Sequence, residues 1–204
     1  MKIKVCGMKY PDNILELSRL SIDFMGLIFY EKSSRCVGEL SPEALHVLPS
    51  SIQKAGVFVN ASEAEVLEKV TKYDLQAVQL HGSESPEFCQ SIKNQNITII
   101  KAFAVSETGD WQQTAEYEHH CDYFLFDTKT PKFGGSGQKF DWKILSSYTG
   151  ETPFFLSGGI GLDDIQAIKR ISHQRLYAID LNSRFEIAPG LKDPDLLRKL
   201  LDEF

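Results

Sequence analysis

Residues 153–171 read Pro-Phe-Phe-Leu-Ser-Gly-Gly-Ile-Gly-Leu-Asp-Asp-Ile-Gln-Ala-Ile-Lys-Arg-Ile and contain the repeating unit of this sequence. The unit begins with a short apolar run at 153–156, which is typical of a strand buried on both faces. A glycine-rich turn follows, and residues 162–171 then place apolar side chains at helical spacing. The stretch therefore predicts one strand–turn–helix unit of a parallel α/β fold.

The same unit recurs along the chain. Further apolar runs occur at residues 3–6, 24–29, 55–59, 77–80, 97–103, 123–126 and 176–179. Helical patterns are expected at residues 13–20, 62–73, 86–93 and 195–201, while residues 106–120 are polar and only weakly periodic. Eight strands with mostly helical connections predict an α/β fold, a single-domain (β/α)8 TIM barrel over residues 1–204. An open, doubly wound sheet is the alternative, although it usually has fewer strands.

Composition excludes several classes of protein. The 13 Phe, 7 Tyr and 2 Trp among 204 residues argue against a disordered chain. With 22 basic and 28 acidic residues the net charge is −6, so we expect no general nucleic-acid binding. No apolar stretch approaches the ~20 residues of a membrane span, and no signal-peptide pattern precedes the first strand. We therefore expect a cytoplasmic protein without a membrane partner.

The four cysteines, Cys6, Cys36, Cys89 and Cys121, share no metal-binding spacing. We expect neither a zinc site nor a disulfide framework, and a thiol-redox role is disfavoured because no resolving pair is apparent. Cys36, Cys89 and Cys121 are interpreted as small apolar fillers. Cys6 differs because a glycine follows it at a strand end.

Polar residues end several of the apolar runs, and in a barrel this is where catalytic groups lie. Period-two alternation places Lys4 on the same strand face as Cys6, Leu125 with Asp127, and Ala178 with Asp180. If these faces point into the barrel, a thiol and two carboxylates converge on one mouth. Each aspartate could instead be a cap or turn former. His81, which follows Gln79 at the end of another run, could simply hydrogen-bond to backbone.

Two glycine clusters point to different functions. Gly158 and Gly159 follow a strand and precede a helical pattern, so their N–H groups are suited to bind a phosphate. Tight turns also need glycine, which makes this signal weak by itself. Residues 134–137, Gly-Gly-Ser-Gly, lie in a long loop and are interpreted as a lid or hinge. Neither cluster forms a nucleotide-binding fingerprint.

Taken together, these motifs resemble the phosphoribosylanthranilate isomerase family. The resemblance runs through residues 4–8 (Lys-Val-Cys-Gly-Met), 34–35 (Ser-Arg), 56–60, 78–82 (Val-Gln-Leu-His-Gly), 126–128 (Phe-Asp-Thr), 134–137, 140–142, 157–159 and 190–193. It implies the Amadori isomerisation of N-(5-phosphoribosyl)anthranilate to 1-(2-carboxyphenylamino)-1-deoxyribulose 5-phosphate, a step of tryptophan biosynthesis. The reaction needs neither a metal nor an organic cofactor, because the substrate's iminium group accepts the electrons.

The resemblance also implies roles for individual residues. Cys6 is expected to be the general base, and Asp127 the general acid. Arg35 is expected to hold the anthranilate carboxylate, while Gln79, His81 and Asp180 contact the substrate. The phosphate group is expected to bind to Gly158, Gly159, Asn182, Ser183 and Arg184.

The acid and base roles require shifted pKa values, because an ordinary Asp is ionised and an ordinary Cys mostly protonated at pH 7. Lys4, on the same face as Cys6, is a candidate for lowering the thiol pKa.

One segment departs from the family pattern. After Asp180 the family usually reads Ser-Ser-Gly-Val-Glu, whereas this chain reads Leu-Asn-Ser-Arg-Phe-Glu over residues 181–186. Arg184 stands at the position of the usual glycine, so its Cβ could block close backbone approach to a phosphate. Arg184 could instead add a charge-assisted contact, or lie in solvent.

Two other functions stay open. The first is another phosphosugar barrel enzyme, although a histidine-pathway isomerase would need a carboxylate pair that includes the first strand, and an indole-glycerol-phosphate synthase would need a catalytic Lys with Glu partners. The second is a catalytically silent phosphate-binding barrel. The protein could be a monomer or a homodimer, and Leu27 and Phe185, expected at the surface, do not distinguish the two.

Overall fold

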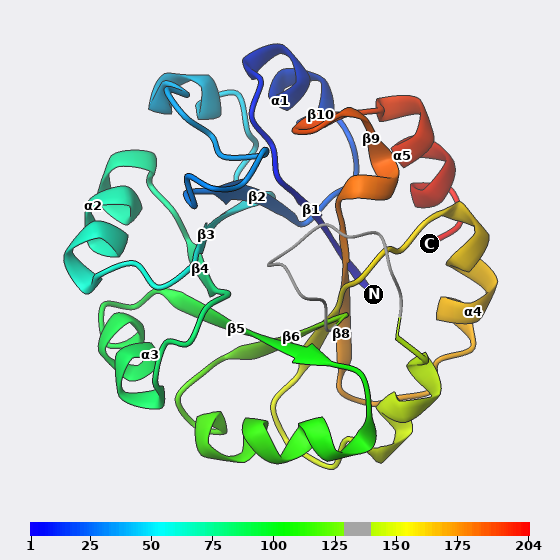
Figure 1. The fold of residues 1–204 in the computed structure, drawn as a ribbon. Helices are drawn as coiled ribbons and strands as arrows, with labels where there is room; N and C mark the ends of the chain where they lie inside the picture. Colours follow the sequence, from blue (N-terminus) through cyan, green and yellow to red (C-terminus); the bar gives the residue numbers. More distant parts are fainter. Residues whose placement is uncertain (129–139) are drawn as a thin grey trace.

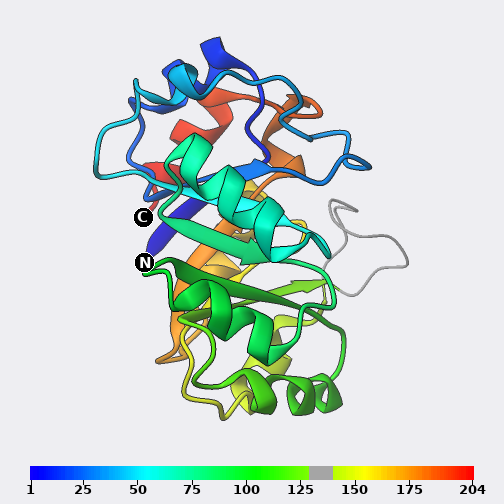
Figure 2. The same ribbon diagram turned by 90° about the vertical axis from the view of Figure 1, so that its left-hand side faces the viewer.

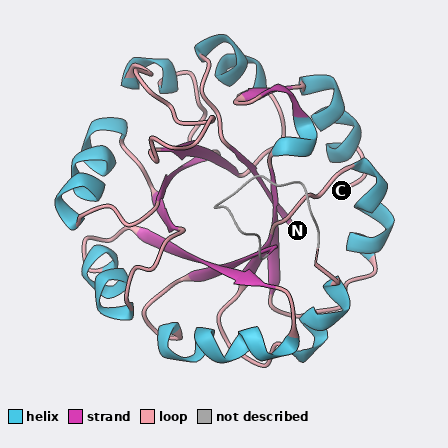
Figure 3. Ribbon diagram, in the orientation of Figure 1, coloured by secondary structure: helices cyan, strands magenta, loops and turns pink. Residues whose placement is uncertain are grey.

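The computed structural model describes residues 1–128 and 140–204, in which the apolar runs form eight parallel strands that close into a barrel in chain order. Seen along the barrel axis, the strands make an inner ring and the helices an outer one (Figures 1 and 3). The strands are β1 (Lys2–Cys6), β2 (Phe24–Ile28), β3 (Gln53–Phe58), β4 (Ala77–Leu80), β5 (Thr98–Val105), β6 (Tyr123–Thr128), β7 (Phe154–Leu156) and β8 (Leu176–Leu181). The predicted barrel is confirmed, and the open sheet is excluded.

The connections are partly α-helical and partly 3-10 turns. The α-helices are α1 (Pro11–Leu17), α2 (Glu63–Tyr73), α3 (Pro86–Lys93), α4 (Ile165–Lys169) and α5 (Pro194–Leu201). The 3-10 segments are η1 (Pro42–Leu45), η2 (Thr108–Tyr117), η3 (Trp142–Ser147), η4 (Leu162–Asp164) and η5 (Ser183–Phe185). A short antiparallel hairpin, β9 (Glu186–Ala188) with β10 (Leu191–Lys192), follows β8 outside the barrel.

Local sequence signals set several helix boundaries. Ser62 caps α2 and forms a capping box with Glu65, as its sequence predicts. Pro86 is the first residue of α3, where its missing N–H costs nothing. The helix predicted over residues 162–171 is wrong in its first part. There the Asp164 side chain accepts a 2.7 Å hydrogen bond from the Gly161 N–H, and the chain forms the 3-10 turn η4 before α4 begins.

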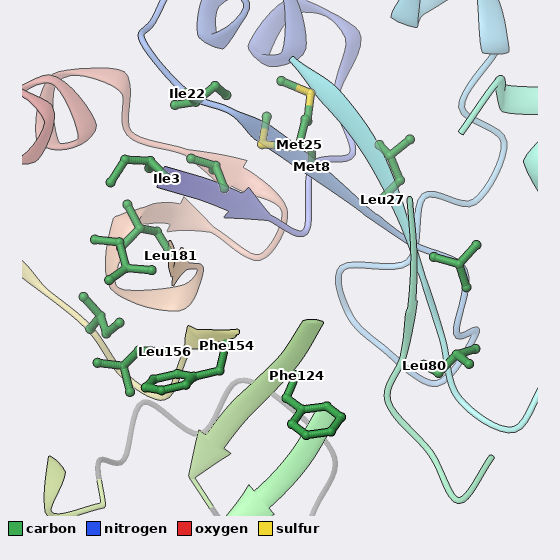
Figure 4. Packing of buried hydrophobic residues seen from close by; sticks show 14 of the residues in the cluster. Ile3, Met8, Ile22, Met25, Leu27, Leu80, Phe124, Phe154, Leu156 and Leu181 are labelled. Atoms are coloured by element: carbon green, nitrogen blue, oxygen red, sulfur yellow. The ribbon is translucent and has the colours of Figure 1, made fainter. Parts of the chain in front are cut away.

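The main hydrophobic core lies between the strand ring and the outer helices. Figure 4 shows part of it, with side chains such as Ile3, Met25 and Leu181 from neighbouring strands. Leu27 and Phe185 belong to this core and are fully buried, so the expectation that they lie at the surface is wrong.

A second, smaller core fills the inside of the barrel. Its buried members are Phe24, Ala55, Ala77, Ile100, Ala102, Leu125, Phe155 and Ala178, which come from every strand except β1. On β1 the inward position is taken by Lys4, which is fully buried and lies opposite Phe24 of β2 and Asp180 of β8. The interior of the barrel is therefore largely apolar, and Lys4 introduces a charged group into it.

The eight barrel strands run in one direction, so their carboxyl ends meet at one mouth. In Figure 2 the strand arrows point away from the end at which both chain termini lie. The loops that follow the strands surround the opposite end, where a barrel of this kind binds its ligands. Among the described residues, none of the helices has the length and apolar character to cross a bilayer.

Candidate active site

A cavity opens at the carboxyl ends of the strands and collects most of the candidate site residues. Its lining includes Cys6, Gln79, His81, Asp127, Gly158, Gly159, Asp180, Asn182, Ser183 and Arg184. An apolar wall of Ile28, Tyr30, Val57 and Val59 faces part of this set. The predicted convergence of one thiol and two carboxylates on a single mouth is therefore observed.

Cys6 is the last residue of β1 and packs with Ile28 and Val57, with Tyr30 against them. Burial raises the pKa of the Cys6 thiol, because the apolar surroundings disfavour the thiolate. The Lys4 ammonium opposes this effect through its charge and a hydrogen bond to the thiol. The suggestion that Lys4 lowers the thiol pKa is thus correct in direction, but burial outweighs it.

Lys4 also binds Asp180 inside the barrel. Its Nζ donates a 2.8 Å hydrogen bond to Oδ1 of Asp180, and both side chains are buried. Burial is the largest effect on Lys4 and disfavours its charge, but attraction to Asp180 and Cys6 raises the pKa of Lys4 above its ordinary value. Lys4 therefore carries a positive charge between the thiol and the carboxylate.

Asp127 lies near the end of β6 and opens onto the cavity. Burial raises the pKa of Asp127, although hydrogen bonds from the Thr128 N–H and from Ser157 and the charge of Lys4 partly offset this. A raised pKa increases the share of the protonated carboxyl near neutral pH, which is the form that a general acid needs.

His81 faces Asp127 from β4, with Nε2 of the imidazole 3.6 Å from Oδ2 of Asp127. The Gln79 side-chain amide and Nδ1 of His81 form a 2.9 Å hydrogen bond, and with the amide nitrogen as donor the ring proton sits on Nε2. Burial and the nearby charge of Lys101 lower the pKa of His81 to about 4. The ring is thus neutral and lies beside the Asp127 carboxyl at a distance longer than a hydrogen bond, and its hydrogen-bond partner is the Gln79 side chain rather than backbone.

The glycine turn after β7 borders the same cavity. Gly158 has φ +99°, a conformation that side chains rarely adopt, and a Cβ there would lie 3.1 Å from the backbone N of Thr128. Gly159 follows with φ +62°. The turn does not lead directly into an α-helix, because η4 intervenes and α4 has only five residues. The predicted contribution of a helix dipole is therefore weak. An anion at this turn would be bound by the backbone N–H groups of the turn itself.

Asn182, Ser183 and Arg184 form the neighbouring wall after β8. Arg184 lies beside Gly161, where a Cβ on the glycine would stand 3.7 Å from the Arg184 Cβ. The arginine therefore takes its place at the cavity rim next to the glycine turn.

Arg35 is the one candidate that does not belong to the cavity lining. Its guanidinium forms an ion pair with Glu186 of β9, in which Nη2 lies 2.7 Å from Oε2. Its stem runs close to Gly7, next to Cys6.

Two buried lysines of this region were not anticipated as site residues. Lys192 is fully buried and binds Glu186 and Asn182, and its charge acts on Cys6. Lys101 pairs with the buried Glu84 and acts on His81. A lysine within an otherwise apolar run, as at Lys101, is a signal that could have been followed. Within residues 1–128 and 140–204 there is no cluster of three or more His, Cys, Asp or Glu suited to a metal ion.

Comparison with known proteins identifies the family. A profile of the family described as N-(5'phosphoribosyl)anthranilate (PRA) isomerase matches residues 3–203. The N-(5'-phosphoribosyl)anthranilate isomerase of Parabacteroides distasonis is 48% identical over 206 residues, which cover 100% of this chain and 93% of the relative. The chain belongs to the N-(5'-phosphoribosyl)anthranilate isomerase family.

Solved structures agree with this membership. The phosphoribosyl anthranilate isomerase of Thermotoga maritima superposes with a TM-score of 0.85 at 33% identity, covering 100% of this chain and 98% of that one. A second structure, a phosphoribosyl anthranilate isomerase in complex with reduced 1-(o-carboxyphenylamino)-1-deoxyribulose 5-phosphate, gives 0.82 at 29% identity and covers 100% and 97%. As a member of the family, the chain is an isomerase of tryptophan biosynthesis.

Proposed function

We propose that the chain converts N-(5'-phosphoribosyl)anthranilate to 1-(2-carboxyphenylamino)-1-deoxyribulose 5-phosphate, with Cys6 as base and Asp127 as acid. The observation that carries this assignment is that a thiol and a carboxyl with a raised pKa line one cavity beside a neutral His81. The solved complex of a related isomerase with the reduced product supports the choice of ligand.

The first step is opening of the ribose ring. Protonated Asp127 gives its proton to the ring oxygen, the bond from that oxygen to C1 breaks, and the nitrogen lone pair forms the C1–N double bond of an iminium ion. Neutral His81 then serves as a donor that stabilises the Asp127 carboxylate left behind.

The second step is proton abstraction at C2. The base is the thiolate form of Cys6, which burial disfavours and which the positive charges of Lys4 and of the substrate's iminium group favour. The thiolate takes the C2 proton, the electron pair moves into a C1–C2 double bond, and the iminium nitrogen becomes neutral. The resulting enolamine gains a proton at C1 and loses the proton of its C2 hydroxyl, which yields the ketone. Protons and electrons balance within the substrate and the two side chains, and Asp180, held by Lys4, orients the reacting hydroxyl or amine groups.

The cavity walls match the two ends of this substrate. Ile28, Tyr30 and Val57 provide an apolar face for the anthranilate ring next to Cys6. On the other side, Gly158 and Gly159 with Asn182, Ser183 and Arg184 provide donors and a positive charge for the phosphate. Arg35, whose stem lies against Gly7 next to Cys6, binds the anthranilate carboxylate.

We further propose that the protein acts in the cytoplasm as one domain, as a monomer or a homodimer. A related isomerase from Thermotoga maritima is described as dimeric. Analytical ultracentrifugation of the full chain decides between the two states. Residues 134–137, interpreted as a lid, lie outside the described residues.

The decisive experiment is a turnover assay in which the consumption of phosphoribosylanthranilate is monitored by the loss of the substrate's fluorescence. A separate measurement gives the Kd of the reduced product. Turnover that disappears in Cys6→Ala and Asp127→Asn supports the assignment. Binding of the phosphorylated ligand without turnover by the unaltered chain would instead indicate a catalytically silent barrel.

A further inference from the structure

The guanidinium of Arg35 is fixed along one edge by Glu186. Its Nε donates to Oε1 at 2.9 Å and to Oε2 at 3.0 Å, and its Nη2 donates to Oε2 at 2.7 Å. Among the described residues these bonds use Nε and Nη2, and Nη1 takes part in none of them. A guanidinium held bidentately has a fixed plane, so the orientation of its remaining edge is determined as well.

Glu186 does not simply cancel the charge of Arg35, because Lys192 also pairs with the Glu186 carboxylate. The Nζ of Lys192 lies 2.7 Å from Oε1 of Glu186 and 2.7 Å from Oδ1 of Asn182, and the lysine is fully buried. The Gly190 N–H donates to Oε1 as well, at 3.0 Å. Burial lowers the pKa of Lys192, and the charge and hydrogen bond of Glu186 partly offset this. Lys192 in its ammonium form and Arg35 together place two cations against one anion, and the cluster then keeps a net positive charge for an anionic ligand. In agreement, Arg35 and Lys192 overcome burial and lower the pKa of Glu186.

The cluster lies at the edge of the cavity, beside the base. A Cβ built on Gly7 would stand 3.0 Å from Cδ of Arg35 and 3.0 Å from Oδ1 of Asn182, and Asn182 lines the cavity. Gly7 has φ +79° and follows Cys6 directly. The Arg35 stem is therefore packed against the strand end that carries the thiol, and its side chain is only 14% exposed.

We propose that Glu186, supported by Lys192, is a positioning residue that presents the Nη1 side of Arg35 to the carboxylate of the substrate's aryl group. This inference rests on the proposed function of Arg35. It makes the hairpin of β9 and β10, which contributes both Glu186 and Lys192, part of the device that selects a carboxylated aryl amine.

The test compares two inhibitors, reduced 1-(o-carboxyphenylamino)-1-deoxyribulose 5-phosphate and its phenylamino counterpart without the carboxyl group. Glu186→Gln keeps an oxygen that can accept from Lys192 but loses the charge that fixes Arg35. We expect its KM and its Kd for the carboxylated inhibitor to rise about tenfold, which is the scale of one misaligned charge-assisted bond. The kcat and the Kd of the phenylamino compound should change less than about twofold. Glu186→Asp, which restores the charge, should recover part of the affinity. Glu186→Ala, which also lacks the charge, replaces Glu186→Gln in the comparison if the latter does not fold.

Arg35→Ala and the double variant separate this inference from the proposed function. If Glu186 acts through Arg35, Glu186→Gln has no further effect on carboxylate discrimination in the Arg35→Ala background. Equal weakening of both inhibitors by Glu186→Gln would mean a merely structural role and overturn the inference. An Arg35→Ala variant that loses discrimination while Glu186→Gln retains it would overturn the inference and leave the proposed function intact. Unchanged discrimination in Arg35→Ala would refute the Arg35 assignment itself.

Discussion

Lys4 on β1 donates a 2.8 Å hydrogen bond to Asp180 on β8, and this ion pair lies within the barrel where the other strands contribute apolar side chains. The two residues are partners in the β1–β8 register, so the strand order that closes the barrel also forms the pair. Ser157 Oγ lies 3.5 Å from the other carboxylate oxygen of Asp180. The pairing of β1 with β8 thus closes the barrel and also brings Lys4 next to Asp180 in the site.

Replacing Lys4 by methionine should therefore destabilise the folded protein. Asp180 would remain buried without its cation, and breaking a buried pair in this way typically costs about 3–5 kcal/mol of unfolding free energy. Urea denaturation measures this loss. Lys2→Met is the matched control, because Lys2 lies on the same strand but pairs with Asp23 at the surface, and its effect should be much smaller. Comparable losses in the two variants would contradict this account.

The sequence was sufficient to predict the barrel and most of the cavity lining, because period-two alternation and polar residues at strand ends are local signals. Cys6, Asp127 and Asp180 could be found in this way. The orientation of Arg35 could not, because it is set by Glu186, a residue 151 positions away in the chain. The buried pair of Lys101 and Glu84 depends likewise on how the loop after β4 folds back onto β5.

The shortened α4 shows a different limit. Apolar spacing over residues 162–171 fits an α-helix, but the Asp164 side chain bonds to the Gly161 N–H and stabilises a 3-10 turn instead. Side-chain-to-backbone bonds of this kind compete with the helix within a few residues. Periodicity therefore predicts that a segment is helical more reliably than it predicts where the helix begins.

Replacement of Cys6 by alanine should lower kcat at least ~100-fold with a smaller change in KM, because a general base acts mainly in the transition state. Steady-state kinetics measures both constants. Cys36→Ala is the control, since Cys36 is a half-buried thiol outside the cavity lining and should retain full turnover. Because burial raises the pKa of Cys6, its alkylation by iodoacetamide should be slow at neutral pH and accelerate as the pH rises. Normal turnover by Cys6→Ala would remove the thiol from the mechanism.

Asp127→Asn should abolish most turnover, with kcat reduced at least ~100-fold, yet stabilise the fold at higher pH. Burial raises the folded-state pKa of Asp127, so the folded protein holds this proton more tightly than the unfolded chain. The resulting stabilisation is present below the unfolded pKa and is lost as the pH rises through the folded pKa. The Tm of the variant, relative to the unaltered protein, should therefore increase with pH. A Tm difference that is independent of pH, or that decreases with pH, would contradict the raised pKa.

His81 should remain a neutral imidazole across the pH range in which an ordinary histidine titrates, because burial and Lys101 lower its pKa from 6.5 to about 4. Its ring resonances in NMR spectra, assigned by their loss in His81→Gln, should show no inflection near pH 6.5. The unfolded chain binds this proton at a higher pH than the folded protein does, so the contribution of neutral His81 to the stability is lost as the pH falls from 6.5 toward 4. His81→Gln should thus lose less stability than the unaltered protein over that interval. A ring that titrates near pH 6.5 would show that His81 is a cation beside Asp127, and its role as a neutral donor would have to be abandoned.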